Sequence, residues 1–301
     1  MKRILSLDGG GVRGALTTCF LVELERRTGK LCREYFDLVA GTSTGALIAT
    51  AIAAGIPATT ILEIYQQDCP KLFHLSTVES WAERILKGYA YHPEAVKQIL
   101  VNRLGASASW KLNDSPVRLL LTAKGMNGHP WYFVRDNPKN AGTTGGLSLL
   151  DCAIASGAAP TYFAPWYVSP VSILVGWCFD GGTGITGNPV HQAVVEAFRY
   201  DDFDPADTRV ISLGTGFVPD LQTNPPAGLL DTLTWTIDTL LDAPIDEQSN
   251  LVNLYYAGIL QRYNWQLPAA VDMADAGAIP GLVELGQKVV PAMDWDAILK
   301  D

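Results

Sequence analysis

Two apolar segments, each followed by a glycine-rich turn and a helical pattern, constrain the fold of this chain most strongly. The apolar segments are Ile4–Leu7 and Phe36–Ala40. The helical patterns that follow run from Val12 to about Arg27 and from Gly45 to about Ala54. A strand, a tight turn and a helix repeated in this way indicate a parallel sheet covered by helices.

The same alternation continues to the end of the sequence. We expect further strands at Val117–Lys124, Trp131–Val134, Gly176–Phe179 and Val210–Leu213, and further helices at Pro93–Leu104, Leu147–Ser156, Pro189–Phe198, Leu229–Leu241, Glu247–Tyr263 and Gly281–Val289. There is no internal repeat, low-complexity tract or linker to divide them. The sequence therefore predicts a single α/β domain over residues 1–301, a three-layer α/β/α sandwich with a mainly parallel central sheet.

Composition narrows the class of partner. The formal net charge is −9, which argues against binding to a nucleic acid polymer, because such binding needs a basic face. No apolar run approaches the ~20 residues that cross a bilayer. The start of the chain shows no signal peptide, and five scattered cysteines suggest reduced thiols. We expect a cytoplasmic protein, with any membrane contact peripheral and mostly apolar.

The first candidate for chemistry is a G-x-S-x-G sequence, Gly41 to Gly45, between the second strand and its helix. A serine at such a turn, here Ser43, adopts a strained backbone, and small residues on either side let the chain segments pass closely. The helix N-terminus favours the oxyanion that develops in acyl transfer. The alternative is a glycine-rich turn in which Ser43 only caps the helix.

The second candidate is the glycine loop after the first strand, where Asp8 precedes Gly9, Gly10 and Gly11, and Arg13 follows. Consecutive glycines let backbone N–H groups converge on an anion, which could be a phosphate or an oxyanion. The stretch also matches the dinucleotide fingerprint G-x-G-x-x-G. That site requires an acidic residue at the end of the second strand, where this chain has glycines instead. A P-loop sequence is absent as well.

The third candidate is Asp180, followed by Gly181 and Gly182 directly after the expected strand Gly176–Phe179. Open α/β sheets place their sites at the carboxyl ends of strands. An acid there can act as a base, or it can simply form a turn. The four histidines show no metal-ligand spacing, so we expect neither a metal nor a cofactor.

Together and in this order, the three motifs resemble those of the patatin-like phospholipase family. D-G-G-G-x-R-G, G-T-S-T-G and D-G-G all occur, as do family-like stretches at 157–160, at 162–163, at 211–216 and around Gln248 and Ser249. The resemblance covers about residues 3–290. It implies a patatin-like fold and a Ser–Asp dyad, with Ser43 as nucleophile and Asp180 as base.

The resemblance also assigns Gly9, Gly10, Gly11 and Arg13 to the oxyanion loop, with Gly41 and Gly45 forming the nucleophile elbow. The loop after Asp180 departs from the family pattern, because a single Asn precedes Pro189 where members often have two. We therefore expect this loop to be reshaped.

Three further features carry alternatives. His191 follows Ser43 and Asp180 in the chain order of a Ser–Asp–His triad, although its place inside a helix favours a structural role. An aromatic set could line an acyl channel or belong to the core: Trp166, Tyr167, Trp177 and Phe179. Leu72-Phe73 and the stretch Trp81–Tyr91 could form a lid or a membrane-facing cap, or simply pack.

The expected function is hydrolysis of fatty-acyl esters of membrane lipids by a phospholipase A or lysophospholipase type of enzyme. A soluble carboxylesterase or thioesterase with the same dyad is the first alternative. A catalytically dead module that holds lipid or nucleotide through the glycine loop is the second. The expected partner is a phospholipid or another acyl lipid. The sequence leaves a homo-oligomer and activation by a signalling nucleotide open.

Overall fold

The computed structural model describes residues 1–75, 77–140, 143–170, 173–184, 186–219 and 245–300. An eight-stranded sheet in the order β10-β9-β1-β2-β4-β8-β7, with β5 paired to β4, forms its centre. The parallel strands are β1 (Lys2–Leu7), β2 (Leu38–Gly41), β4 (Arg118–Gly125), β9 (Thr208–Leu213) and β10 (Leu260–Tyr263). The antiparallel strands are β5 (Pro130–Val134), β7 (Trp166–Val168) and β8 (Gly176–Asp180).

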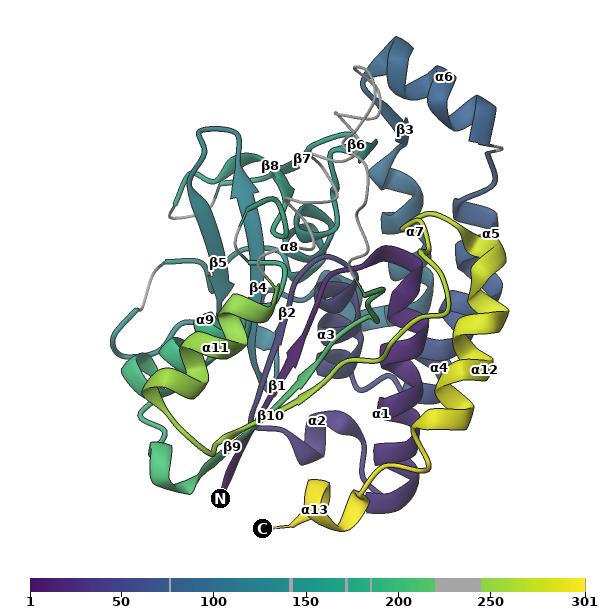
Figure 1. Cartoon of the computed structure of the whole chain (residues 1–301). Coiled ribbons are helices and arrows are strands. Elements are labelled where there is room, and N and C mark those ends of the chain that lie inside the picture. The colour runs from purple at the N-terminus through teal and green to yellow at the C-terminus, as the bar shows by residue number, and fades with distance from the viewer. Residues whose placement is uncertain (76, 141–142, 171–172, 185, 220–244, 301) are drawn as a thin grey trace.

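Helices cover both faces of this sheet, as Figure 1 shows for α1, α4 and α12 on one side and α9 and α11 on the other. The first layer contains α1 (Gly14–Thr28), α2 (Cys32–Tyr35), α3 (Thr44–Ala54), α4 (Ala58–Glu63), α7 (Pro93–Leu104), α8 (Leu149–Ser156), α12 (Ile279–Val289) and α13 (Trp295–Leu299). The second contains α9 (Val190–Val195) and α11 (Ile245–Tyr255). The predicted three-layer α/β/α sandwich with a mainly parallel sheet is confirmed.

The alternation of side chains along the strands explains why both layers are needed. In β1, Leu5 and Leu7 belong to the larger core under α1 and α3, while Ile4 belongs to the smaller core under α9 and α11. In β2, Val39 faces the first core and Leu38 the second. A strand with apolar residues on both faces must be covered twice, which is typical of parallel sheets.

Smaller elements surround one end of the sheet. A π-helical turn, Ile64–Asp68, joins α4 to α5 (Cys69–Leu72), and α6 (Thr77–Lys87) leads into β3 (Tyr89–Tyr91). β3 pairs with β6 (Thr161–Phe163) in a separate two-stranded sheet. Figure 1 shows α6 projecting beyond the rest of the fold at this end.

The helix predicted for Glu247–Tyr263 is wrong in its second half. The helix α11 ends at Tyr255, and Leu260–Tyr263 form β10 at the edge of the parallel sheet. Gly258 lies between them with φ of +84°, a left-handed conformation that a helix cannot continue through. The helix predicted for Leu229–Leu241 lies outside the described residues.

Candidate active site

Ser43 occupies a sharp turn between β2 and α3. Its backbone has φ of 56° and ψ of −124°, a conformation that side-chain-bearing residues rarely adopt. It stands at the N-cap position of α3, but its side chain makes no capping hydrogen bond there. Its backbone N–H donates instead to Ser156 Oγ at 2.9 Å. The turn therefore holds a strained serine whose hydroxyl is not used to cap the helix, as a nucleophile elbow requires.

The two glycines that flank this turn are forced by close approach. A Cβ on Gly41 would collide with the backbone carbonyl of Gly45, and a Cβ on Gly45 would collide with the carbonyl of Leu7. The first turn of α3 is thus pressed against the ends of β1 and β2. Any larger residue at either position would push α3, and Ser43 with it, away from the sheet.

The strand arrangement that brings Asp180 close to Ser43 was not evident from the sequence. β8 runs antiparallel to β4, with Asp180 beside Ala123, whereas β2 ends with Gly41 beside Leu121. Because β5 occupies the other edge of β4, β2 and β8 share one edge and approach each other end to end. The carboxyl end of β8 therefore lies next to the point where β2 turns towards Ser43.

The carboxyl group of Asp180 is buried, with 1% of the residue exposed. Its Oδ1 accepts the Gly182 N–H at 2.7 Å, while no well-formed hydrogen bond reaches its Oδ2 from the described residues. Burial raises the pKa of Asp180 to about 7, against smaller lowering effects from the Ser43 hydroxyl and the Gly182 N–H. The Ser43 hydroxyl is therefore close enough to the Asp180 carboxyl group to influence its pKa.

The glycine loop between β1 and α1 faces this pair. A Cβ on Gly9 would lie 3.1 Å from Ser43 Cβ, so the loop passes directly beside the serine. The N–H of Gly9 donates to Gly187 O at 3.0 Å. The N–H groups of Gly10 and Gly11 make no hydrogen bond within the described part of the chain. The donors available to an anion are therefore those of Gly10 and Gly11, and Gly9 instead leaves room for Ser43.

Arg13 braces this loop from below. Its backbone N–H and its Nε both point to Gly10 O, at 3.2 Å and 3.3 Å respectively. The side chain is buried. These contacts fix the conformation of the loop at Gly10.

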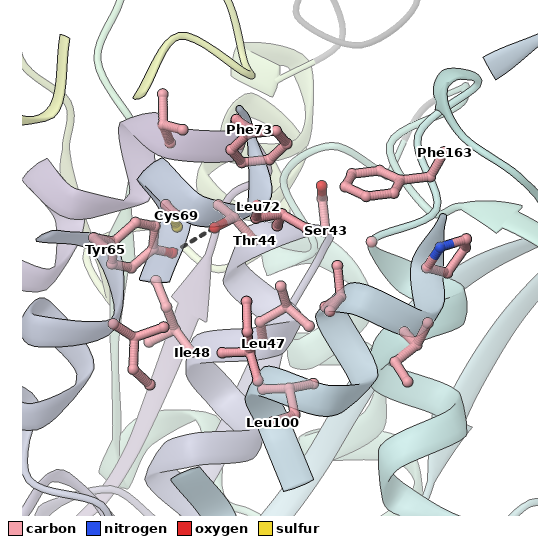
Figure 2. A pocket seen from close by; sticks show the side chains of 18 of the residues that line it. Ser43, Thr44, Leu47, Ile48, Tyr65, Cys69, Leu72, Phe73, Leu100 and Phe163 are labelled. Carbon is pink, nitrogen blue, oxygen red and sulfur yellow. Dashed lines mark hydrogen bonds between the residues drawn. The ribbon is translucent and has the colours of Figure 1, made fainter. Parts of the chain in front are cut away.

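An apolar pocket that is partly open to solvent begins at Ser43. Leu47 and Ile48 from α3, Leu100 from α7, and Phe163 after α8 contribute to its wall. Figure 2 shows the Ser43 hydroxyl near Phe163 and Phe73, with Leu100 well away from it at the other end of the view. The pocket has the shape and chemistry of a site for a hydrocarbon chain.

Of the two alternatives for the aromatic set, a role in lining the acyl channel is wrong for this pocket. Trp166, Tyr167, Trp177 and Phe179 do not contribute to the wall of this pocket. Tyr167 and Trp177 are exposed and pack against each other with ring centres 5.3 Å apart. The wall combines aliphatic side chains from several helices with other aromatic residues: Tyr65, Phe73, Tyr162 and Phe163.

His191 lies in α9, whose neighbours in the core belong to the opposite helical layer from α3. It is half-buried, does not contribute to the pocket wall, and burial lowers its pKa. Among the described residues there is also no cluster of three or more His, Cys, Asp or Glu that could hold a metal ion.

Comparison with known proteins assigns this arrangement to a family. The model of the family described as Patatin-like phospholipase matches residues 5–194, which include Ser43, Asp180 and the glycine loop. The chain belongs to the patatin-like phospholipase family. The resemblance seen in the three sequence motifs is thereby confirmed, and with it the broad class of lipid-degrading hydrolases.

Curated patatin-like relatives come from bacteria and plants. The chain is 30% identical over 244 residues to a cGAMP-activated phospholipase of Escherichia coli, covering 78% of this chain and 67% of that one. It is 30% identical over 302 residues to Patatin-like protein 2 of Arabidopsis thaliana, covering 86% and 72%. A cGAMP-activated phospholipase of Vibrio cholerae is also 30% identical over 232 residues, covering 71% and 64%. The chain thus spans about two thirds of the length of its bacterial relatives.

Among solved structures, VipD from Legionella pneumophila shares the patatin-like fold. The TM-score is 0.50 at 13% sequence identity, and the match covers 97% of this chain and 67% of VipD. At that identity the likeness concerns the fold alone. No helix of the described residues is long and apolar enough to cross a membrane.

Several residues around the patatin-like site were missed by sequence reasoning. Ser156 accepts the Ser43 N–H, Thr215 donates its hydroxyl to Gly9 O at 2.9 Å, and Met273 O accepts the Val12 N–H at 2.9 Å. Thr215 falls in the family-like stretch 211–216, which was a signal for its position but not for its role. Ser156 and Met273 carry no local signal at all.

Proposed function

We propose that the chain is a serine lipid acyl hydrolase of the phospholipase A or lysophospholipase type, acting through a Ser43–Asp180 dyad and an acyl-enzyme. The observation that carries the proposal is the buried carboxyl of Asp180 beside a strained serine at the mouth of an apolar pocket. A mainly apolar pocket next to the serine suits an ester with a long hydrocarbon chain.

The reaction begins with attack of Ser43 Oγ on the ester carbonyl carbon, while Asp180 accepts the hydroxyl proton. The tetrahedral intermediate collapses when the C–O bond to the leaving alcohol breaks, and Asp180 returns the proton to that oxygen. Water then attacks the acyl-enzyme carbonyl, gives its proton to Asp180, and releases the fatty acid as Ser43 regains a proton. A base with a pKa of about 7 suits both directions of transfer near neutral pH.

The oxyanion would be held by the N–H groups of Gly10 and Gly11. Neither makes a hydrogen bond to the residues that the structure describes, and both lie in a loop that passes beside Ser43. Removing one such donor from a serine hydrolase typically lowers kcat by about 10²–10³-fold. Gly9 serves a different purpose in this scheme, because its own N–H is bound to Gly187 and its missing side chain accommodates the nucleophile.

The end of the molecule that carries the pocket suits a peripheral contact with a lipid surface. Arg84 of α6 lies 4.1 Å from the ring centre of Tyr162, which contributes to the pocket wall, so α6 stands at its rim. Ile85 and Leu86 are 68% and 78% exposed on that helix. With a formal net charge of −9, the protein would rely on apolar insertion rather than on general attraction to anionic lipid.

The test is release of fatty acid from phosphatidylcholine vesicles, followed by mass spectrometry, with and without a cyclic dinucleotide. Ser43→Ala and Asp180→Asn should each lower the rate by at least ~10³-fold. Ser115→Ala and Glu196→Gln are matched controls, because they change another buried serine and another buried acid whose pKa is about 7. Most activity retained in Ser43→Ala or Asp180→Asn would refute the dyad.

Hydrolysis of short soluble esters without any release from vesicles would instead indicate a carboxylesterase or thioesterase. A fluorophosphonate that fails to label Ser43 in the folded protein would indicate a binding module without catalysis.

A further inference from the structure

Besides the contacts of Arg13 within the loop, the glycine loop is held by distant parts of the chain. Its anchors are the carbonyl of Gly187, the hydroxyl of Thr215 and the carbonyl of Met273, all from the second half of the chain. The backbone N–H of Asp8, at the start of the loop, donates to Leu213 O at 3.0 Å. The conformation of the loop that carries the Gly10 and Gly11 N–H groups beside Ser43 therefore depends on segments far away in sequence.

The strongest of these anchors is an ion pair between Asp8 and Arg262. Arg262 Nη1 lies 3.0 Å from Asp8 Oδ1, and Nη2 makes a second bond to Oδ2 at 2.5 Å, so the guanidinium grips both carboxylate oxygens. Asp8 is 1% exposed and the Arg262 side chain is 16% exposed. Such a paired, shielded geometry fixes the direction of a carboxylate as well as its position.

The register of the sheet places Arg262 close to Asp8. In β10, Arg262 is in register with Ser212 of β9, which is in register with Ser6 of β1, and Asp8 follows just beyond the end of β1. The Arg262 Nη1 also donates to Ser212 Oγ at 2.9 Å. The Arg262 side chain thus extends from β10 across β9 and reaches Asp8, the first residue of the glycine loop.

We propose that Arg262 is a positioning residue for ester hydrolysis: by holding both oxygens of Asp8, it sets the loop so that the Gly10 and Gly11 N–H groups meet the oxyanion. The inference rests on the proposed function and extends it beyond residues 5–194, the segment that the family model matches. Arg262 does not touch the pocket, and its effect passes through Asp8 to the loop.

The expected consequence of loosening the loop is a fall in kcat with little change in KM. The oxyanion donors act on the transition state, whereas the pocket that binds the acyl chain stays intact. A displacement of catalytic groups by about 1 Å can cost ~10²-fold. We therefore expect Arg262→Gln to lower kcat for p-nitrophenyl butyrate by about 10–100-fold, with KM within about threefold.

Arg262→Lys keeps the charge but cannot bond to both oxygens at once, so we expect an intermediate loss. Asp8→Asn should resemble Arg262→Gln, and the double variant should be no worse than either single one, because both remove the same link. The midpoint of the pH–rate profile should not move in any of them, since Asp180 is untouched.

The matched control is Arg118→Gln, which breaks an ion pair to Asp201 of 2.8 Å, the aspartate side chain being 5% exposed. It should lower thermal stability to a similar degree and leave kcat unchanged. Wild-type kcat in Arg262→Gln, or an equal loss in Arg118→Gln, would overturn the proposal. If Arg262→Gln does not fold, wild-type kcat in both Arg262→Lys and Asp8→Asn overturns it. Failure of the proposed function itself is distinct, because wild type and Ser43→Ala would then be equally inactive.

Discussion

At the scale of single residues, the proposed chemistry depends on one carboxyl group, that of Asp180, which the fold keeps away from water. Burial raises the pKa of Asp180 from its ordinary value of 3.8 to about 7, and an unbonded oxygen remains on its carboxyl group within the described structure. An ordinary aspartate would be a weak base for a serine hydroxyl. Burial in the fold thus gives this aspartate a pKa of about 7, a value close to that of an ordinary histidine side chain.

The first prediction concerns the pH dependence of the rate. Because the base must be ionised, kcat/KM for a neutral soluble ester should rise with pH through about 7 and level off above it. His191→Ala should leave this midpoint unchanged, since His191 belongs to the other helical layer. A midpoint between 4 and 5, or one that moves in His191→Ala, would contradict the assignment of Asp180 as the base.

The second prediction concerns stability. With its pKa raised on folding, Asp180 keeps its proton in the folded state at a pH where the unfolded chain has lost it, so its contribution to stability falls as pH rises from about 4 to 7. At 1.36 kcal/mol per pKa unit, this amounts to about 4 kcal/mol. The Asp180→Asn variant has no carboxyl group at this position, so it does not undergo this pH-dependent loss of stability.

The advantage in unfolding free energy of Asp180→Asn over wild type should therefore grow across that pH range, as measured by urea titration. Glu196→Gln should show a similar trend, because burial and Asp201 raise the pKa of Glu196 to about 7 as well. Unlike Asp180→Asn, it should stay active. A pH-independent difference for Asp180→Asn would argue against a raised pKa.

At the scale of elements, sequence patterns predicted the turns that depend on neighbouring residues in the chain. They missed the contacts between residues that only the sheet brings together. The elbow at Ser43 and the glycine loop were predicted because each requires a particular residue beside a strand end. β8 was expected as a strand, but its antiparallel course depends on which strand it meets. Arg262 had no signal, because its segment was assigned to a helix and its partner Asp8 is remote in sequence.

The pocket was missed for a related reason. Its wall combines one face of α3 with parts of the π-helical turn Ile64–Asp68, α5 and α7. In the sequence, the apolar face of each helix is indistinguishable from a face that packs in the core. Only the arrangement of these helices in the fold leaves a pocket between them. The sequence offered aromatic residues near strand ends as one alternative for the channel, and two of them, Tyr167 and Trp177, are exposed.

The third prediction uses the depth of this pocket. Leu100→Trp should fill the part far from Ser43, so that kcat/KM falls at least ~10-fold for long-chain p-nitrophenyl esters and stays within about twofold for the acetyl ester. Val101→Trp, at a neighbouring position that is 38% exposed, is the control and should change neither. Equal losses on all chain lengths would mean that Leu100 does not limit the acyl chain.

At the scale of the whole molecule, exposed apolar residues are unevenly distributed. Ile85 and Leu86 stand on α6 at the pocket end, and Leu254 and Tyr255, 73% and 68% exposed, end the helix α11. The two pairs are alike in exposure and in being consecutive in a helix. They differ in that only the first stands beside the pocket rim.

The fourth prediction follows from that difference. Ile85→Ser with Leu86→Ser should weaken flotation with phosphatidylcholine vesicles by at least ~10-fold, since each buried aliphatic side chain contributes about 1.5–3 kcal/mol. Leu254→Ser with Tyr255→Ser should float like wild type. Hydrolysis of a soluble ester should be unchanged in both. Equal flotation of the two double variants would exclude α6 as the contact surface.

The position of β1 in the middle of the sheet has a consequence for biosynthesis. Leu7 of β1 pairs with Gly41 of β2 on one edge of the strand and with Leu213 of β9 on the other. Asp8, the next residue, forms its ion pair with Arg262 of β10. Chains leave the ribosome from the N-terminus, so the serine emerges long before the strands that complete its surroundings. Under the proposed function, a polypeptide that ends before β9 and β10 therefore carries Ser43 without the segments that complete its site, and ester hydrolysis begins only after those two strands have been made.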